Sequence, residues 1–201
     1  IVGQIAGSAA LSAAVTVGAF VIQDMLGQKT PWGGIASATV TIGTAFMAQM
    51  LSRLMLRQGR RRGLMLGYSL ALIGGVIAGF GVEQQSLGIF LCGLFLFGNG
   101  QSANLLSRYA ATDLAKAENR GVAMSRILFA STFGAVFGPI LIKPAEHLGQ
   151  SLFGWNLYTG PWVFSGLFFI TSFINAALRL KPDPLVVSGG IARRKSSDNA
   201  S

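Results

Sequence analysis

Polar side chains recur at helical spacing within two long apolar stretches of this 201-residue chain. In the first stretch, Gln4, Ser8 and Ser12 follow one another every four residues, and Thr16 continues the series. This spacing places the side chains on one face of an α-helix. Their amide and hydroxyl groups can donate and accept hydrogen bonds, so the stripe predicts contact either with a bound solute or with a neighbouring helix.

The second stretch is richer in amides. Asn104 and Ser107 are three residues apart and share a helix face, and Asn99 is offset from them only modestly. A polar group without a partner in hydrocarbon costs several kcal/mol, so each of these side chains needs a hydrogen-bond partner. For every one of them, the alternative to solute contact is an interhelical hydrogen bond. The residues predicted to line a solute pathway are Gln4, Ser8, Ser12, Asn99, Gln101 and Asn104.

Charged residues near these stretches predict a network at one end of them. Arg126 lies about one turn inside an apolar stretch, where a guanidinium is costly unless it reaches water or finds a carboxylate. Asp113 and Glu118 in the preceding connection are the candidate partners. We predict a charge network of Arg108, Asp113 and Arg126, and direct contact between Arg126 and a solute is the alternative.

The sequence lacks the residue patterns of an enzyme. The single His, His147, lies beside Glu146 in a connection, and no apolar stretch carries a pair of carboxylates. Neither metal-ligand spacing nor a Gly-rich phosphate loop followed by Lys and Ser or Thr occurs. The single Cys, Cys92, excludes a disulfide framework. We expect no catalytic activity, no cofactor and no metal site.

Six apolar stretches must position these polar residues. Each is close to the roughly 20 residues that cross a hydrocarbon core of about 30 Å as a helix. With 51% hydrophobic and 11% charged residues, the chain has too little polar surface to cover a soluble globule of its size. The sequence therefore predicts an all-α integral membrane protein with a six-transmembrane-helix bundle, over residues 2–23, 34–55, 64–82, 87–106, 122–142 and 163–178.

The basic residues are distributed unevenly between the two sides of this bundle. Fourteen of the sixteen Lys and Arg residues fall in the second connection, the fourth connection and the tail, and the opposite side holds only Lys29 and Lys143. Because Lys and Arg in short loops set orientation, both termini and the even connections should be cytoplasmic in the cell membrane. Anionic membrane lipids, and not nucleic acid, account for the net charge of +9.

The two ends of the chain also carry predictions. No Met precedes Met25 and the first apolar stretch begins at once, so we expect a short cytoplasmic lead to be missing; a cleaved signal peptide is the rival interpretation. Residues 1–181 are predicted to form the bundle, because the prolines at 182 and 184 end the last helix. Residues 182–201 are polar and basic and are expected to form a cytoplasmic tail or linker.

Residues 52–62, in the second connection, resemble the signature between helices two and three of the major facilitator superfamily, usually written G-x-x-x-D-R-x-G-R-R. Arg57, Gly59, Arg60 and Arg61 match it, whereas Ser and Leu replace its first Gly and its Asp at positions 52 and 56. The alternative is an ordinary basic loop. Under either interpretation, a tight reversal between two helices favours a Gly at position 59, because Gly tolerates a positive φ.

Residues 98–113, 118–125 and 134–141 resemble helix four, the following loop and helix five of the same permeases. The run from Gly134 to Pro139, which includes Gly138, is similar to the helix-five signature of drug–proton antiporters, although Ser125 replaces its first Gly and residues 142 and 143 depart from its end. Pro139 should bend this helix near residues 137–142. The resemblance implies that the bend acts as a hinge or gate; a static kink is the alternative.

The resemblance implies a twelve-helix transporter built of two six-helix halves, each half consisting of two inverted three-helix repeats. This chain then corresponds to the N-terminal half, which would pair with a second six-helix half or self-associate. The implied function is drug-efflux-like secondary transport of a small solute by alternating access. A six-helix interaction or scaffold protein that carries no solute is the alternative.

Overall fold

The computed structural model of the chain describes residues 1–27, 31–114 and 117–180, and every regular element in this part is a helix. The predicted tail, 182–201, lies outside the described residues, as do Lys29, Lys116 and the side chain of Asp113. The elements are α1 (Val2–Leu26), η1 (Pro31–Gly33), α2 (Gly34–Gln58), α3 (Arg60–Glu83), α4 (Leu87–Leu114), η2 (Ala117–Asn119), α5 (Arg120–Ile140), α6 (Ile142–Phe153) and α7 (Thr159–Arg179).

Six of these helices, α1, α2, α3, α4, α5 and α7, are long and apolar enough to cross a membrane. The prediction of six spanning helices is confirmed, and most of them extend a few residues beyond the predicted bounds. Large apolar side chains cover the outside of the bundle: Phe46, Phe129 and Leu178 are each about two-thirds exposed. Exposure of this kind is inexpensive only where the solvent is hydrocarbon, so the bundle belongs in a bilayer.

The helices pair in a pattern that repeats itself. Helix α1 packs mainly on α5 and α7, α4 packs mainly on α3 and α2, and α3 packs on α7. The pattern becomes clear if α1 is matched with α4, α2 with α5 and α3 with α7. The α1–α5 pair then corresponds to the α4–α2 pair, and the α1–α7 pair corresponds to the α4–α3 pair. The α3–α7 pair corresponds to itself. The predicted architecture of two inverted three-helix repeats accounts for this pattern.

Glycines bring the backbones of matched pairs together. A Cβ added at Gly134 of α5 would meet the carbonyl oxygen of Ile5 in α1, and Gly138 lies against the same helix one turn further on. In the corresponding α2–α4 pair, a Cβ at Gly43 would meet the carbonyl oxygen of Phe95. Because lipid offers no hydrophobic drive for helix association, such close van der Waals contact is a main source of stability in the bundle.

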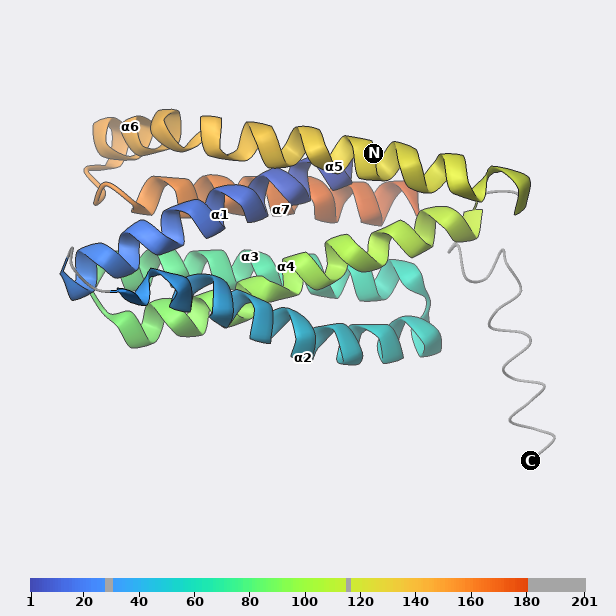
Figure 1. Cartoon of the computed structure of the whole chain (residues 1–201), viewed down its shortest axis with the longest axis horizontal. Helices are drawn as coiled ribbons and strands as arrows, with labels where there is room; N and C mark the ends of the chain where they lie inside the picture. Colours follow the sequence, from blue (N-terminus) through green and yellow to red (C-terminus); the bar gives the residue numbers. More distant parts are fainter. Residues whose placement is uncertain (28–30, 115–116, 181–201) are drawn as a thin grey trace.

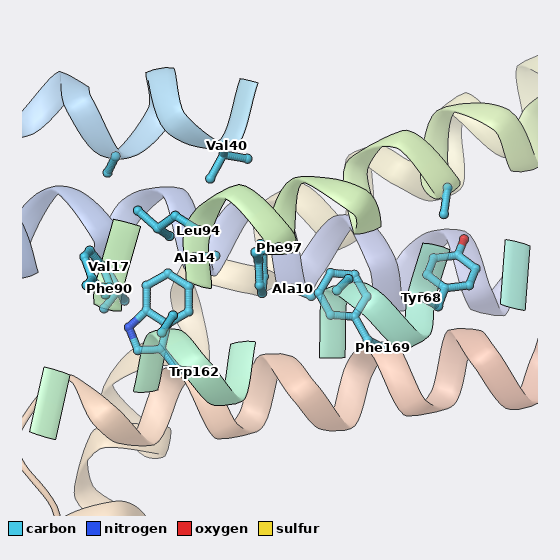
Figure 2. Close-up of a cluster of buried hydrophobic side chains, with 14 of the residues drawn as sticks. Ala10, Ala14, Val17, Val40, Tyr68, Phe90, Leu94, Phe97, Trp162 and Phe169 are labelled. Atoms are coloured by element: carbon cyan, nitrogen blue, oxygen red, sulfur yellow. The ribbon is translucent and has the colours of Figure 1, made fainter. Parts of the chain in front are cut away.

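An aromatic cluster fills the space between α3, α4 and α7. The Trp162 ring meets Phe90 and Phe97 edge to face, with centroid distances of 5.4 and 5.5 Å, and Phe169 continues the cluster (Figure 2). A Cβ added at Gly75 of α3 would meet the Phe97 ring at ordinary van der Waals distance. Edge-to-face pairs of this kind contribute about 0.5–1.5 kcal/mol each beyond their buried area, so the cluster helps to fix how α4 and α7 are rotated against each other.

The ends of the helices are sorted between the two ends of the bundle. Figure 1 shows the α2–α3 turn, the end of α4 and the end of α7 toward one end, with the α1–α2 and α3–α4 turns and α6 at the other. The first end therefore gathers the basic connections. This arrangement agrees with the predicted alternation of the chain, whereas the side on which each end lies stays a prediction.

Helix α6 was not predicted. Helix α5 ends at Ile140, directly after Pro139, and α6 begins at Ile142, so the chain breaks within the interval where a bend was expected. Residues 143–147 looked like a loop because they contain Lys, Pro, Glu and His. The helix forms because Ala145 and Gly149 pack closely against Gly160 at the start of α7.

Candidate functional site

A groove of about 440 Å³ opens between α1, α4 and α5. Its size is within the range of small-molecule sites. Polar side chains come from all three helices: Ser8, Ser12 and Thr16 from α1; Gln101, Asn104 and Arg108 from α4; and Ser131 from α5. Four apolar residues complete the lining: Leu11, Val15, Leu105 and Ala135.

Helical spacing explains why these residues meet. On α1 the serines and Thr16 recur every four residues, and on α4 Gln101, Asn104 and Arg108 are separated by three and four. Each set therefore occupies one face of its helix. The α1–α5 and α1–α4 contacts turn those faces toward the same space. The structure thus brings four of the six predicted pathway residues together: Ser8, Ser12, Gln101 and Asn104.

Asn104 is the most buried amide of the groove, with 4% of its surface exposed. Its Nδ2 donates a hydrogen bond to Ser8 Oγ at 3.1 Å, which joins α4 to α1. Its Oδ1 has no hydrogen-bond partner among the described residues. Gly7 makes room for this side chain, because a Cβ there would lie 3.0 Å from Oδ1. The amide oxygen is therefore shielded from solvent beside Gly7, while the amide nitrogen joins α4 to α1.

Two hydroxyl groups of α1, those of Ser12 and Thr16, are already engaged as donors. Ser12 Oγ donates to the carbonyl oxygen of Ala135 in α5 at 2.8 Å, and Thr16 Oγ1 donates to the Ser12 carbonyl at 3.0 Å. The Ser12 bond joins α1 to α5 in the wall of the groove, whereas the Thr16 bond lies within α1. Each hydroxyl still has lone pairs that can accept a hydrogen bond from a molecule in the groove.

Two longer side chains in the groove have unused hydrogen-bonding capacity. Gln101 is half-buried, and its amide makes no hydrogen bond in the described part of the chain. Arg108 is also half-buried, and its Nε is inaccessible to water and has no hydrogen-bond partner there. Of the groove-lining residues, only Arg108 carries a formal charge. Arg108 was not among the pathway residues predicted from the sequence. Its position four residues after Asn104, on the same helix face, was a signal for it.

Two predicted pathway residues lie elsewhere. Gln4 donates from Nε2 to the Asn104 carbonyl at 3.4 Å and accepts from Ser107 Oγ at 2.8 Å. Asn99 is fully buried and donates from Nδ2 to the Leu96 carbonyl at 2.6 Å. Neither lines the groove. Gln4 makes the interhelical hydrogen bonds that were the alternative, and Asn99 bonds within its own helix.

The predicted charge network stays a prediction. Arg126 is exposed on α5 and does not line the groove, and the Asp113 side chain lies outside the described residues. Among the side chains that the structure places, no three His, Cys, Asp or Glu residues gather as metal ligands would.

The sequence profile of the Major Facilitator Superfamily matches residues 3–197. The chain belongs to this superfamily. It is 37% identical over 199 residues to "Uncharacterized MFS-type transporter YddS" of Bacillus subtilis, covering 99% of this chain and 45% of that protein. It is 35% identical over 187 residues to "Uncharacterized MFS-type transporter YdeG" of the same organism, covering 93% of this chain and 43% of that protein. The chain thus spans about half the length of these curated relatives.

In this facilitator half, the α2–α3 turn has the geometry that its sequence suggested. Gly59 ends α2 with φ 98° and ψ 158°, and its N–H donates to the Met55 carbonyl. This backbone conformation is essentially restricted to Gly. Arg61 Nε donates at 3.1 Å to the carbonyl of Ala177, in the last turn of α7. The positive guanidinium also interacts favourably with the negative, C-terminal end of the α7 dipole. The α2–α3 turn is therefore attached to α7.

At the other end of the half, Glu83 attaches α3 to the start of α7. Its carboxylate accepts hydrogen bonds from the Asn156 backbone N–H at 2.8 Å, from Asn156 Nδ2 at 3.1 Å and from Thr159 Oγ1 at 2.6 Å. The carboxylate therefore joins α3 to the residues at the start of α7, where a negative charge interacts favourably with the positive end of the α7 dipole. Helix α7 is thus bound to α3 near both of its ends.

Proposed function

We propose that this chain forms the first six-helix half of a secondary transporter that moves a small amphipathic solute, in the manner of drug-efflux proteins, by alternating access. The groove between α1, α4 and α5 is its share of the solute site. The observation that carries the proposal is the convergence of Ser8, Gln101, Asn104 and Arg108 on one open groove in a membrane bundle.

The open side of the groove supports a second half. Polar side chains exposed to hydrocarbon are costly, so the groove needs a partner or water over it. The curated relatives are about twice as long as this chain, which leaves room for another bundle of the same size. In facilitators, solute is held near the midplane between two such halves.

The lining chemistry favours an amphipathic solute. Leu11, Val15 and Leu105 can cover an apolar body, while the amides and hydroxyls on α1 and α4 can bind polar groups. A scaffold protein without a solute would need no such groove. Its polar stripes would all be used between helices, as they are at Gln4.

Transport by the natural full-length protein tests this proposal. It should be reconstituted into proteoliposomes and assayed with a panel of amphipathic compounds under imposed proton and sodium gradients. We expect saturable transport of at least one compound, reduced about tenfold or more in Asn104→Leu, because the solute loses a buried hydrogen-bonding group.

Thr171→Val is the matched control. Thr171 is exposed on α7, away from the groove, and its hydroxyl donates only to the Leu167 carbonyl at 3.0 Å. This variant should transport like the wild type. Saturable transport that is equally fast in Asn104→Leu would place the solute site elsewhere, and absence of transport with every compound and gradient would favour the scaffold alternative.

A further inference from the structure

Among the described residues, the groove carries one formal charge, and that charge is positive. Arg108 is the single charged side chain of the lining, and no acid lies beside it there. Its four helical neighbours at spacings of three and four carry no carboxylate either: Asn104, Leu105, Ala111 and Thr112. The side chain of Asp113, five residues further along, lies outside the described residues.

An arginine in this position favours an anion. Its Nε is shielded from water without a hydrogen-bond partner among the described residues, so part of the guanidinium has lost hydration without replacement. A carboxylate or phosphate can accept two parallel hydrogen bonds from a guanidinium, and such charge-assisted bonds are about twice as strong as neutral ones. A cation in the same groove would be repelled, and the repulsion is strengthened by the apolar surroundings.

The rest of the lining describes the remainder of the ligand. Gln101 and Asn104 lie on the same face of α4 as Arg108 and also line the groove, and Gln101 makes no side-chain hydrogen bond among the described residues. Leu11 and Val15 of α1 offer apolar contact across the groove. A ligand that fits has an apolar body with an anionic group at one end.

We propose that the groove recognises the anionic group of an amphipathic organic acid through Arg108, and that the transporter selects such anions over cations of the same shape. The selectivity for anions rests on the proposed function, whereas the binding site itself does not. An anionic lipid headgroup has the same chemistry as the acid, so the two sources must be separated by experiment.

Three ligands of nearly one shape provide the test: benzoate, benzamide and benzylammonium. Their binding is measured by calorimetry on the natural full-length protein in nanodiscs of phosphatidylcholine, whose headgroups carry no net charge. Benzoate should bind at least about tenfold more tightly than benzylammonium, as one charge-assisted hydrogen-bonded pair requires. Arg108→Gln should weaken benzoate about tenfold or more and leave benzamide unchanged. Arg108→Lys keeps the charge but cannot make two parallel hydrogen bonds, so its affinity for benzoate should lie between those of the wild type and Arg108→Gln.

Arg53→Gln is the control for losing one positive charge. Arg53 is exposed on α2 outside the groove, so benzoate should bind this variant as it binds the wild type. The inference is overturned if benzoate fails to bind, if benzylammonium binds equally well, or if Arg108→Gln leaves benzoate affinity unchanged. It is also overturned if added phosphatidylglycerol abolishes benzoate binding, since the site would then belong to a lipid headgroup.

The two proposals fail separately. Transport of cationic or neutral compounds that is indifferent to Arg108→Gln would reject anion selectivity and leave the transporter proposal intact. Arg108-dependent binding of benzoate without transport of any compound would reject the transporter proposal and retain the anion site.

Discussion

At Gly134 the absence of a side chain lets the backbone of α5 lie on the backbone of α1, beside the groove wall. A Cβ at this position would meet the carbonyl oxygen of Ile5, which belongs to the main chain and cannot rotate away. Gly88 provides a contrast, because an added Cβ at that exposed helical position meets nothing within 4 Å. The two glycines therefore have opposite expected responses to the same substitution.

Gly134→Ala should destabilise the bundle by about 2 kcal/mol, the usual cost of forcing extra volume into a packed contact. Gly88→Ala should be neutral or stabilising by up to about 1 kcal/mol, because alanine is the better helix former. Reversible unfolding in mixed detergent–SDS micelles measures both. Equal effects of the two substitutions would mean that the backbones of α1 and α5 are not in close contact at Gly134.

The α2–α3 turn joins two elements through a conformation that only Gly adopts easily. Gly59→Val places a β-branched residue at φ 98°, at a cost of about 1–3 kcal/mol, and disturbs the attachment of Arg61 to α7. We expect transport by the natural protein to fall more than its expression. Gln58→Val, at the exposed preceding residue, is the control and should transport normally. Normal transport by a well-folded Gly59→Val protein would mean that the signature at residues 52–62 acts only as a cluster of positive charges that orients the protein in the membrane.

Helix α6 carries a carboxyl group whose ionisation opposes its docking on α7. Burial raises the pKa of Glu146, and the nearby Lys143 lowers it by less. A carboxyl with a raised pKa stabilises the folded state below its unfolded pKa, and this contribution is lost as the pH rises through the folded value. The docking of α6 should therefore weaken as the pH rises from acidic to neutral.

Glu146→Gln should remove this pH dependence and slow hydrogen exchange of the α6 amides at neutral pH. The gain in the free energy of docking should be less than about 1 kcal/mol, because the side chain is partly exposed. Glu118→Gln removes the same charge from an exposed position in η2 and should leave exchange in α6 unchanged. Faster exchange of α6 in Glu146→Gln would show that the ionised carboxylate stabilises the docked helix.

For the whole molecule, the grouping of connections at two ends predicts which sites face the cytoplasm. Cysteines introduced at 53–62, 113–120 and after 181 should be shielded from a membrane-impermeant thiol reagent in intact cells. Those introduced near Lys29, Glu83 and Glu146 should react. The native Cys92 is exposed on α4, so Cys92→Ala is the background for the assay. The reverse pattern of labelling would overturn the orientation drawn from the basic residues.

This chain by itself should not transport. Alternating access moves one bundle against another around a site between them, and a single bundle leaves its groove open. Purified chain in liposomes should show no saturable uptake of drugs or sugars, and Asn104→Leu should make no difference to that result. Saturable, Asn104-dependent uptake by a demonstrated monomer would refute the assignment as half of a transporter.

Much of the architecture follows from the sequence alone because it depends on local properties. The length and hydropathy of each stretch decide that it spans the membrane as a helix, and the turn at Gly59 follows from the conformational freedom of one residue. Helix α6 escaped prediction because its polar and proline residues read as a loop, while its formation depends on contacts of Ala145 and Gly149 with α7.

Which residues line the groove was decided by the tertiary structure. The sequence indicated polar faces on α1 and α4 but did not separate Gln4 and Asn99, which are held within the bundle, from Gln101 and Arg108, which line the groove. In a soluble protein, hydropathy tells the inner face of a helix from the outer one. In a bilayer both faces are apolar, so the rotation of each helix is set by close contacts such as that of Gly134 with Ile5, which only the assembled bundle defines.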